Sequence, residues 1–171
     1  MTLTITKILV LLAAPLLASA APWPRPKTVT PPSQPELNLF ARGTQNYICD
    51  ASQGKWLLLG ADAPLWDQHG NEVGRHFFVD AVPHWQLHSD SSFIATKAVI
   101  PIPSPHGPTE NIPWVMTQKA WSSQSGKMSE INFVARIDTE GGVAPPNEWC
   151  HWEADGKEYR KEYAARYLFA K

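Results

Sequence analysis

The chain has 171 residues, of which 43% are hydrophobic and 18% are charged, and its formal net charge is −1. It contains no block of basic residues, so its composition argues against nucleic acid or an anionic membrane surface as the main partner. The chain is long enough to form one domain with a core of its own.

The first 20 residues have the pattern of a secretory signal peptide. Lys7 supplies a positive charge, an apolar run covers residues 8–17, and Ala18-Ser19-Ala20 is a small-residue cleavage site. The apolar run is too short to span a bilayer, which needs about 20 residues. We therefore expect a secreted, extracellular protein, cleaved after Ala20 and not inserted in a membrane once the signal is removed.

Residues 21–36 form a proline-rich linker. Proline fixes φ and removes a backbone donor, so this stretch is expected to be extended and to stay outside any sheet. The folded domain is therefore predicted to cover residues 37–171.

Short β-type runs alternate with turn signals through this domain, and no long segment has a helical period. Breaks are predicted at 68–71, 89–92 and 122–127. The pattern predicts a single all-β domain, either an antiparallel β-sandwich or a barrel.

Period-two patterns mark which residues share a face of these strands. Gln45, Tyr47 and Cys49 fall on one face of an expected strand. In the C-terminal segment Tyr163, Tyr167 and Phe169 do the same, although its alanines also allow a helix.

Cys49 and Cys150 are the two cysteines of the chain. In an exported protein such a pair is more often bridged than free. A shared metal is the alternative, but neither residue has a second Cys or His at C-x-x-C spacing. We expect a disulfide that closes a loop of about 100 residues.

The segment RIDTEGGVAPPNEWC (136–150) raises the question of a phosphate-binding loop. It lacks G-x-G-x-x-G, and two prolines follow the glycines where a long helix would have to begin. We interpret Gly141-Gly142 as a turn tethered by Cys150. The sequence therefore predicts no nucleotide or nicotinamide cofactor, and no other cofactor.

The six histidines suggest a metal site only weakly, and surface or turn positions are the favoured interpretation. His84 and His88 would be about 13 Å apart on a strand. His69 and His76 flank a turn beside Asp67, so these three are weak metal candidates. No G-x-S-x-G motif and no distinctive carboxylate pair occur, and no catalytic residue is assigned.

Eight tryptophans are many for a chain of this length. Trp56 and Trp114 lie in apolar runs and are expected in the core. Trp66, Trp85 and Trp121 lie at strand ends or beside polar residues, where they are candidates for stacking on sugar rings or anchoring a protein partner.

Several motifs in order resemble the domain-of-unknown-function 3455 family of small secreted fungal and bacterial proteins. They are GTQNYIC, APLWDQHGNEVGRH, IPWVM, RIDTEGGVAP and YAARYLF. Fungal members are often labelled malate dehydrogenase, but the missing cofactor loop argues against an NAD-dependent malate dehydrogenase here. The resemblance marks Gly43, Gln45, Tyr47, Cys49, Gly70, Gly74, His76, Trp85, Pro113, Trp114, Arg136, Thr139, Gly141, Gly142, Pro145, Cys150, Tyr163, Tyr167 and Phe169.

These features favour a secreted, non-catalytic monomer that acts at a cell wall or a host surface. It would be an effector, elicitor or virulence protein, or a carbohydrate- or protein-binding module whose partner is a cell-wall glycan or a host surface protein. The alternative is an extracellular hydrolase or metal-assisted enzyme of unknown substrate.

The binding candidates are His76, Trp85 and Arg136, which we expect on one face. A titratable donor, a flat aromatic ring and a guanidinium together suit a sugar or peptide ligand. The structural alternative is that Arg136 pairs with Asp138 and that His76 caps its hairpin.

Overall fold

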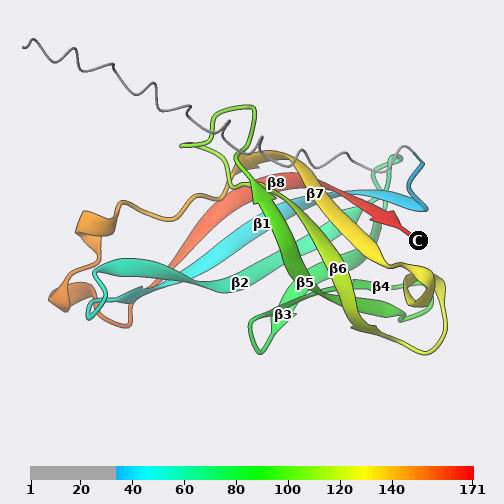
Figure 1. Ribbon diagram of the computed structural model, residues 1–171, viewed down its shortest axis with the longest axis horizontal. Helices are drawn as coiled ribbons and strands as arrows, with labels where there is room; N and C mark the ends of the chain where they lie inside the picture. The colour runs from blue at the N-terminus through cyan, green and yellow to red at the C-terminus, as the bar shows by residue number, and fades with distance from the viewer. Residues whose placement is uncertain (1–33) are drawn as a thin grey trace, which may run out of the picture.

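The computed structural model describes residues 34–171 as an antiparallel β-barrel (Figure 1). The predicted signal peptide and the proline-rich segment up to residue 33 lie outside the described residues. The all-β prediction is confirmed, and the barrel is the architecture found. The strands are β1 (Leu37–Asp50), β2 (Lys55–Trp66), β3 (Glu72–Val79), β4 (Val82–Leu87), β5 (Phe93–Ile102), β6 (Trp114–Ser122), β7 (Phe133–Gly141) and β8 (Glu158–Ala170).

The barrel is an up-and-down meander. Each strand pairs with the next along the chain, and β8 pairs back with β1 from Leu37↔Phe169 to Ile48↔Glu158. This closure pairs the first and last strands, which would otherwise be sheet edges. A barrel of eight strands has an interior that side chains can fill or that can hold one small ligand.

Alternation along the strands confirms the predicted faces. Gln45, Tyr47 and Cys49 are buried on β1. Tyr163, Tyr167 and Phe169 are buried on β8, so the C-terminal segment is a strand and the helical alternative is wrong.

The three predicted turns fall where strands end or meet. β2 gives way to β3 through residues 67–71, where the Asp67 carboxylate accepts backbone N–H groups of His69 (2.8 Å) and Asn71 (2.9 Å). The turn between β4 and β5 uses Asp90, which accepts the N–H of Ser92 (2.9 Å). Acidic side chains therefore hold both turns by Asx-type hydrogen bonds.

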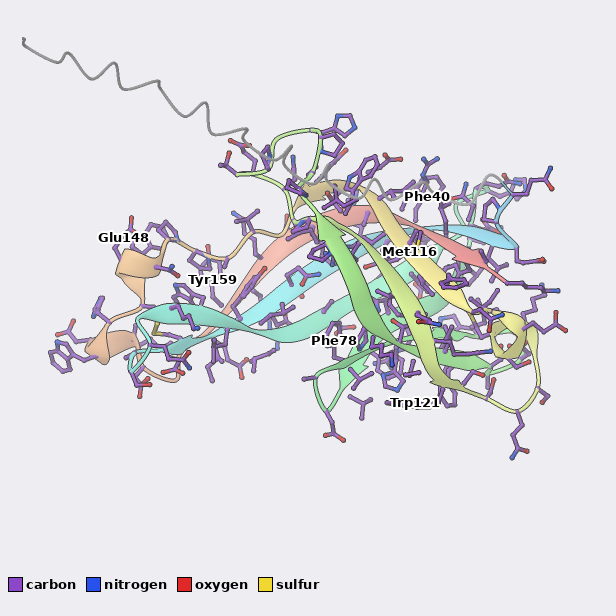
Figure 2. The ribbon with its side chains drawn as sticks, viewed as in Figure 1. Phe40, Phe78, Met116, Trp121, Glu148 and Tyr159 are labelled. Carbon is purple, nitrogen blue, oxygen red and sulfur yellow. A yellow bond between two sulfur atoms is a disulfide. The ribbon has the colours of Figure 1, made fainter. Side chains whose placement is uncertain are left out.

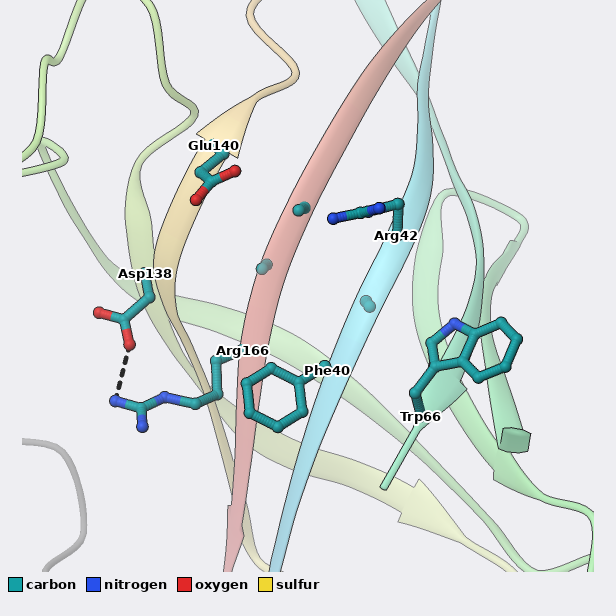
Figure 3. A pocket seen from close by; sticks show the side chains of 9 residues that line it. Phe40, Arg42, Trp66, Asp138, Glu140 and Arg166 are labelled. Atoms are coloured by element: carbon teal, nitrogen blue, oxygen red, sulfur yellow. Dashed lines mark ion pairs between the residues drawn. The ribbon is translucent and has the colours of Figure 1, made fainter. Parts of the chain in front are cut away.

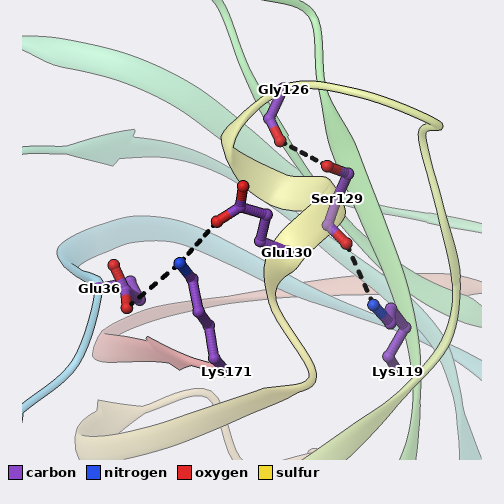
Figure 4. A network of polar contacts seen from close by, with 6 residues as sticks. All are labelled: Glu36, Lys119, Gly126, Ser129, Glu130 and Lys171. Carbon is purple, nitrogen blue, oxygen red and sulfur yellow. Dashed lines mark hydrogen bonds and ion pairs between the residues drawn. The ribbon is translucent and has the colours of Figure 1, made fainter.

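One end of the barrel is closed by a short 3-10 helix, η1 (Lys127–Glu130). Met128 and Ile131 are buried here and join the main core, so we call residues 127–131 the plug. Figure 4 shows how polar groups hold it: the Lys119 ammonium donates to the Ser129 carbonyl (3.1 Å), and Lys171 pairs with Glu130 (2.6 Å).

The opposite end is open. β4 pairs with β5 only from His84 to Gln86, and β2 pairs with β3 only from Ala63 to Trp66. Beyond these pairs the β3–β4 hairpin separates from its neighbours, while β1, β2 and β8 continue away from it (Figure 1).

The predicted disulfide joins Cys49 to Cys150 at the far tip of this open end. Trp56 packs beside it, and two further 3-10 turns, η2 (Asn147–Trp149) and η3 (Trp152–Ala154), flank Cys150. Among residues 34–171, no helix has the length and apolar character needed to cross a bilayer.

Candidate functional site

His76, Trp85 and Arg136 come together inside the open end of the barrel. His76 on β3 is paired directly with Trp85 on β4, and their rings stack with centroids 4.3 Å apart and planes 9° apart. Arg136 on β7 lines the same pocket. The three residues therefore share one surface as expected, but that surface is the barrel interior.

His76 is a buried, neutral imidazole. Its Nδ1 lies 2.8 Å from the carbonyl oxygen of His84, and because a carbonyl can only accept, Nδ1 carries the proton and Nε2 is left as an acceptor. Burial lowers the pKa of His76 to about 3. The expectation that the histidines occupy surface or turn positions is wrong for His76 and also for His84, which is buried on β4.

Trp85 forms a wall of the core, with 2% of its surface exposed. Its ring meets Tyr167 and Phe169 edge-on, at 5.4 and 6.3 Å between centroids, and His76 covers one face. A ring packed in this way has no free face on which a sugar could stack.

Arg136 faces the interior and does not pair with Asp138. Its Nε and Nη2 both donate to the Pro113 carbonyl, at 3.2 and 2.9 Å. Asp138 has a left-handed backbone (φ 48°) at a register shift of β7, which turns its carboxylate outward to Arg166 (2.7 Å). The structural alternative, in which Arg136 pairs with Asp138, is therefore wrong.

These residues line a cavity of about 380 Å³, which we call the lumen pocket. Its walls are mostly apolar and aromatic, with Lys97 contributing from β5. No carboxylate is present among the described side chains that line it. Pockets that hold small molecules in proteins have this composition, with a few polar groups that fix orientation.

Sequence reasoning did not assign a role to three buried tyrosines around this pocket. The Tyr163 and Tyr167 hydroxyls lie 3.3 Å apart, and the Tyr47 hydroxyl donates to the Gly142 carbonyl (2.6 Å). Burial raises the pKa of all three, and the Arg136 charge partly opposes this. The period-two patterns placed Tyr47 on one face of β1, and Tyr163 and Tyr167 on one face of β8, but gave no sign that Arg136 lies beside them.

Two buried polar atoms of the pocket lining have no hydrogen-bond partner among the described residues. They are the indole nitrogen of Trp85 and the hydroxyl oxygen of Thr96. Thr96 does not differ in sequence context from an ordinary strand position, so no pattern could have marked it.

The weak metal candidates do not assemble. Asp67 and His69 lie in the exposed β2–β3 turn, whereas His76 is inside the barrel. Within the part of the chain that the structure describes, no group of three or more His, Cys, Asp or Glu side chains is arranged to hold a metal ion.

β7 ends at Gly141, and the chain then runs through Gly142 to the three-residue turn η2, without a long helix. Gly142 has a φ of 80°, and a Cβ there would lie 2.8 Å from the Cβ of Tyr163. The glycine is thus explained by a positive φ and a close approach. A dinucleotide loop needs a helix N-terminus after its glycines, and this segment has none.

A second hollow, the outer groove, lies on the outside of β7, β8, β1 and β2 and has a volume of about 590 Å³ (Figure 3). Phe40, Arg42, Trp66 and Glu140 line it beside the Asp138–Arg166 ion pair. Unlike the lumen pocket, it carries carboxylates and lies on the outer side of the sheet.

The remaining tryptophans occupy varied positions. Trp56 and Trp114 are only partly buried, packing beside the disulfide and on a small outer cluster with Ile137. Trp121, labelled in Figure 2, is 49% exposed on the outer surface, where its ring meets His84 edge-on. Trp121 and Trp66 therefore offer ring surface on the outside of the barrel, whereas the Trp85 ring is packed in its interior.

Comparison with known proteins agrees with the resemblance found in the sequence. No curated protein and no solved structure gives a significant match to the chain. The model of one family, described as "Protein of unknown function (DUF3455)", matches residues 30–171. That match includes the whole barrel, and the chain belongs to this family.

Proposed function

We propose that the protein is a secreted, non-catalytic binding protein that holds one small molecule in the lumen pocket. The observation that carries this proposal is the convergence of His76, Trp85 and Arg136 on an open cavity of about 380 Å³. Its volume falls in the range of about 300–1,000 Å³ that is typical of small-molecule sites.

The chemistry of the pocket favours binding over catalysis. A general base works best when its pKa lies near the operating pH, whereas burial lowers the pKa of His76 to about 3. Burial raises the pKa of Tyr163 and Tyr167. These groups therefore act as hydrogen-bonding groups of fixed protonation near neutral pH, which supports a carrier or receptor role over the alternative of a hydrolase.

The setting of this activity would be outside the cell, at a cell wall or a host surface. The signal-like N-terminus and the Cys49–Cys150 disulfide are compatible with an oxidising extracellular compartment. A protein that captures a small molecule there can act as an effector or virulence protein without catalysing a reaction.

The test uses a lumen-blocking variant with a matched control. A small-molecule library is screened by thermal shift against the parent protein, Val115→Trp and Gln118→Trp. Val115 lines the lumen pocket from β6, and Gln118 is exposed on the same strand. Ligands that bind the native state raise the melting temperature.

Ligands should stabilise the parent and Gln118→Trp but not Val115→Trp. The proposal is contradicted if the library contains no ligand for the parent, or if ligands bind Val115→Trp as tightly as they bind the control.

A cell-wall glycan is a second candidate ligand, and the outer groove suits it better than the lumen pocket. Phe40 (44% exposed) and Trp66 offer aromatic surface there beside Arg42 and Glu140, a combination that can stack on sugar rings and bind hydroxyl groups. On a glycan array, Trp66→Ala should lose binding while Trp121→Ala keeps it. Equal binding by both variants would contradict this candidate.

A further inference from the structure

We propose that the ligand of the lumen pocket is an amphipathic organic acid, whose carboxylate is bound by Arg136 and whose apolar body lies against the aromatic wall. This inference rests on the proposed function and adds the ligand's chemical class.

Arg136 carries a charge that no acid balances. In the described part of the chain this guanidinium makes no ion pair. Its Nε and Nη2 donate to the neutral carbonyl of Pro113, and the neutral Tyr167 hydroxyl is a further hydrogen-bond partner. A guanidinium has five N–H donors in a planar fork that matches a carboxylate. These neutral partners leave N–H donors of Arg136 for an anion, with the planar geometry already held by Pro113.

The charge of the lumen pocket is positive, because Arg136 lines it and no acid among the described lining side chains offsets this charge. Lys97 also contributes to the lining, but it is exposed and is the register partner of Gln118, so the charge inside the lumen is that of Arg136. A cationic ligand would meet like charge in a partly desolvated site, where such repulsion is stronger than in water. An anionic ligand would instead gain charge-assisted hydrogen bonds, which are about twice as strong as neutral ones.

Two buried polar atoms of the lining, on Trp85 and Thr96, have no hydrogen-bond partner among the described residues. The Trp85 indole N–H can only donate, and the Thr96 hydroxyl can donate or accept; both residues are buried, at 2% and 0% exposure. Buried polar groups without a partner are costly. Because solvent does not reach these two atoms, a ligand rich in acceptor oxygens would complete them only with a small movement of the lining side chains. His76 Nε2 offers an acceptor for a ligand hydroxyl.

The apolar body of the ligand is indicated by the rest of the lining. Phe78, Pro83 and Val134 surround the stacked pair of His76 and Trp85. An aromatic acid and a medium-chain fatty acid share the required chemistry, because each joins one carboxylate to a compact apolar group. The two sources differ in shape, so the experiment uses both.

The experiment compares each acid with its neutral amide by isothermal titration calorimetry. One pair is naphthoic acid and naphthamide, and the other is decanoic acid and decanamide. At least one acid should bind the parent about tenfold or more tightly than its amide, as expected for a hydrogen bond to a charged group. Which pair shows the preference identifies the aromatic or the aliphatic source.

Arg136→Met should remove the preference for the acid while the amide still binds, and Arg136→Lys should retain part of it. Arg160→Met, which removes an exposed cation from β8 outside the lining of the lumen pocket, should leave the preference unchanged. If Arg136→Met fails to fold, the ratio of acid affinity to amide affinity, measured for the parent and for Arg136→Lys, still tests the inference.

If the parent binds acid and amide equally, the inference of an organic acid is overturned and the proposed function stands. The same holds if Arg136→Met prefers the acid over the amide as strongly as the parent does. If neither acids nor amides bind while library ligands still require an open lumen, the inference fails alone. If no library ligand binds either, the proposed function fails with it.

Discussion

The two ends of the barrel are built in opposite ways. At the closed end, the plug fills the interior with Met128 and Ile131, which are 0% and 1% exposed, and its backbone is fastened by Ser92, Asp90 and Lys119. At the open end, strands separate, Arg136 has no carboxylate partner within residues 34–171, and two buried polar atoms of the described lining lack partners.

Within one sheet, the closed end contributes to stability and the open end contains the candidate binding site. Buried polar groups are normally hydrogen-bonded. Each exception needs an explanation, such as a functional role or stored strain. The closed end satisfies this rule around the plug, while the open end departs from it around His76 and Trp85. We therefore expect changes at the closed end to alter stability alone and changes at the open end to alter binding as well.

The largest effect should come from removing the disulfide, which closes a loop of 101 residues at the tip of the open end. Replacing Cys49 and Cys150 together by Ala should lower the free energy of unfolding by about 4–5 kcal/mol, because the unfolded chain regains the loop's entropy. Urea unfolding measures this. Hydrogen exchange should accelerate at Trp56 and its neighbours more than at the plug, and uniform acceleration would contradict the separation of the two ends.

The next effect should come from the plug. Met128→Ala removes a fully buried side chain and should cost about 3 kcal/mol, within the range for large-to-small core changes. Its matched control is Lys127→Ala, because Lys127 is exposed on the same turn. Ligand affinity should be unchanged in both variants, and a loss of affinity in Met128→Ala would show that the two ends are coupled.

We expect the pH dependence of the free energy of unfolding to reflect the protonation of His76 at the open end. The pKa of this residue is about 3 when folded and about 6.5 when unfolded, so the unfolded state binds the extra proton between these values. Stability is then complete above the unfolded pKa and falls as the pH drops toward the folded one. From about pH 7 to pH 5 the loss should be about 2 kcal/mol.

His76→Gln should remove that dependence in the same range, where the carboxylates with lowered pKa values, such as Asp67 and Asp90, are still ionised. Urea unfolding at several pH values gives the measurement. An unchanged slope in His76→Gln would mean that another group titrates.

The smallest effect should come from the exposed ion pair that fastens the plug. Lys171 and Glu130 are both largely exposed, at 51% and 65% of their side chains, so solvent screens their attraction. Lys171→Met should shift the melting temperature only slightly, and the shift should vanish at high salt. A large shift that persists in salt would show that this pair matters more to the closed end than its exposure indicates.

Local patterns in the sequence predicted much of this fold. Period-two alternation identified which residues of β1 and β8 share a face, turn residues identified the breaks at 68–71 and 89–92, and the cysteine pair identified the disulfide. Closure of β8 on β1 joins segments far apart in the chain, so no local pattern could separate a barrel from a sandwich.

The sequence predicted which residues form the candidate site but not how they are arranged. His76, Trp85 and Arg136 do line one pocket, yet the left-handed backbone at Asp138 reverses which residue faces outward. That conformation is unusual for a residue other than glycine. His76 and His84 are buried because the sheet closes. The same closure determines that no carboxylate is among the described residues that line the pocket. Neither feature could be deduced from the spacing of residues in the sequence.

The most direct test of the account is to map a bound organic acid by nuclear magnetic resonance. Isotope-labelled protein is titrated with naphthoic acid or decanoic acid, whichever binds more tightly, and backbone and side-chain signals are followed. The account predicts that the largest changes fall on the Trp85 indole, Thr96 and the Arg136 guanidinium, with Met128 and Ile131 unmoved. Changes confined to the plug or to the outer groove, or no changes at all, would contradict it.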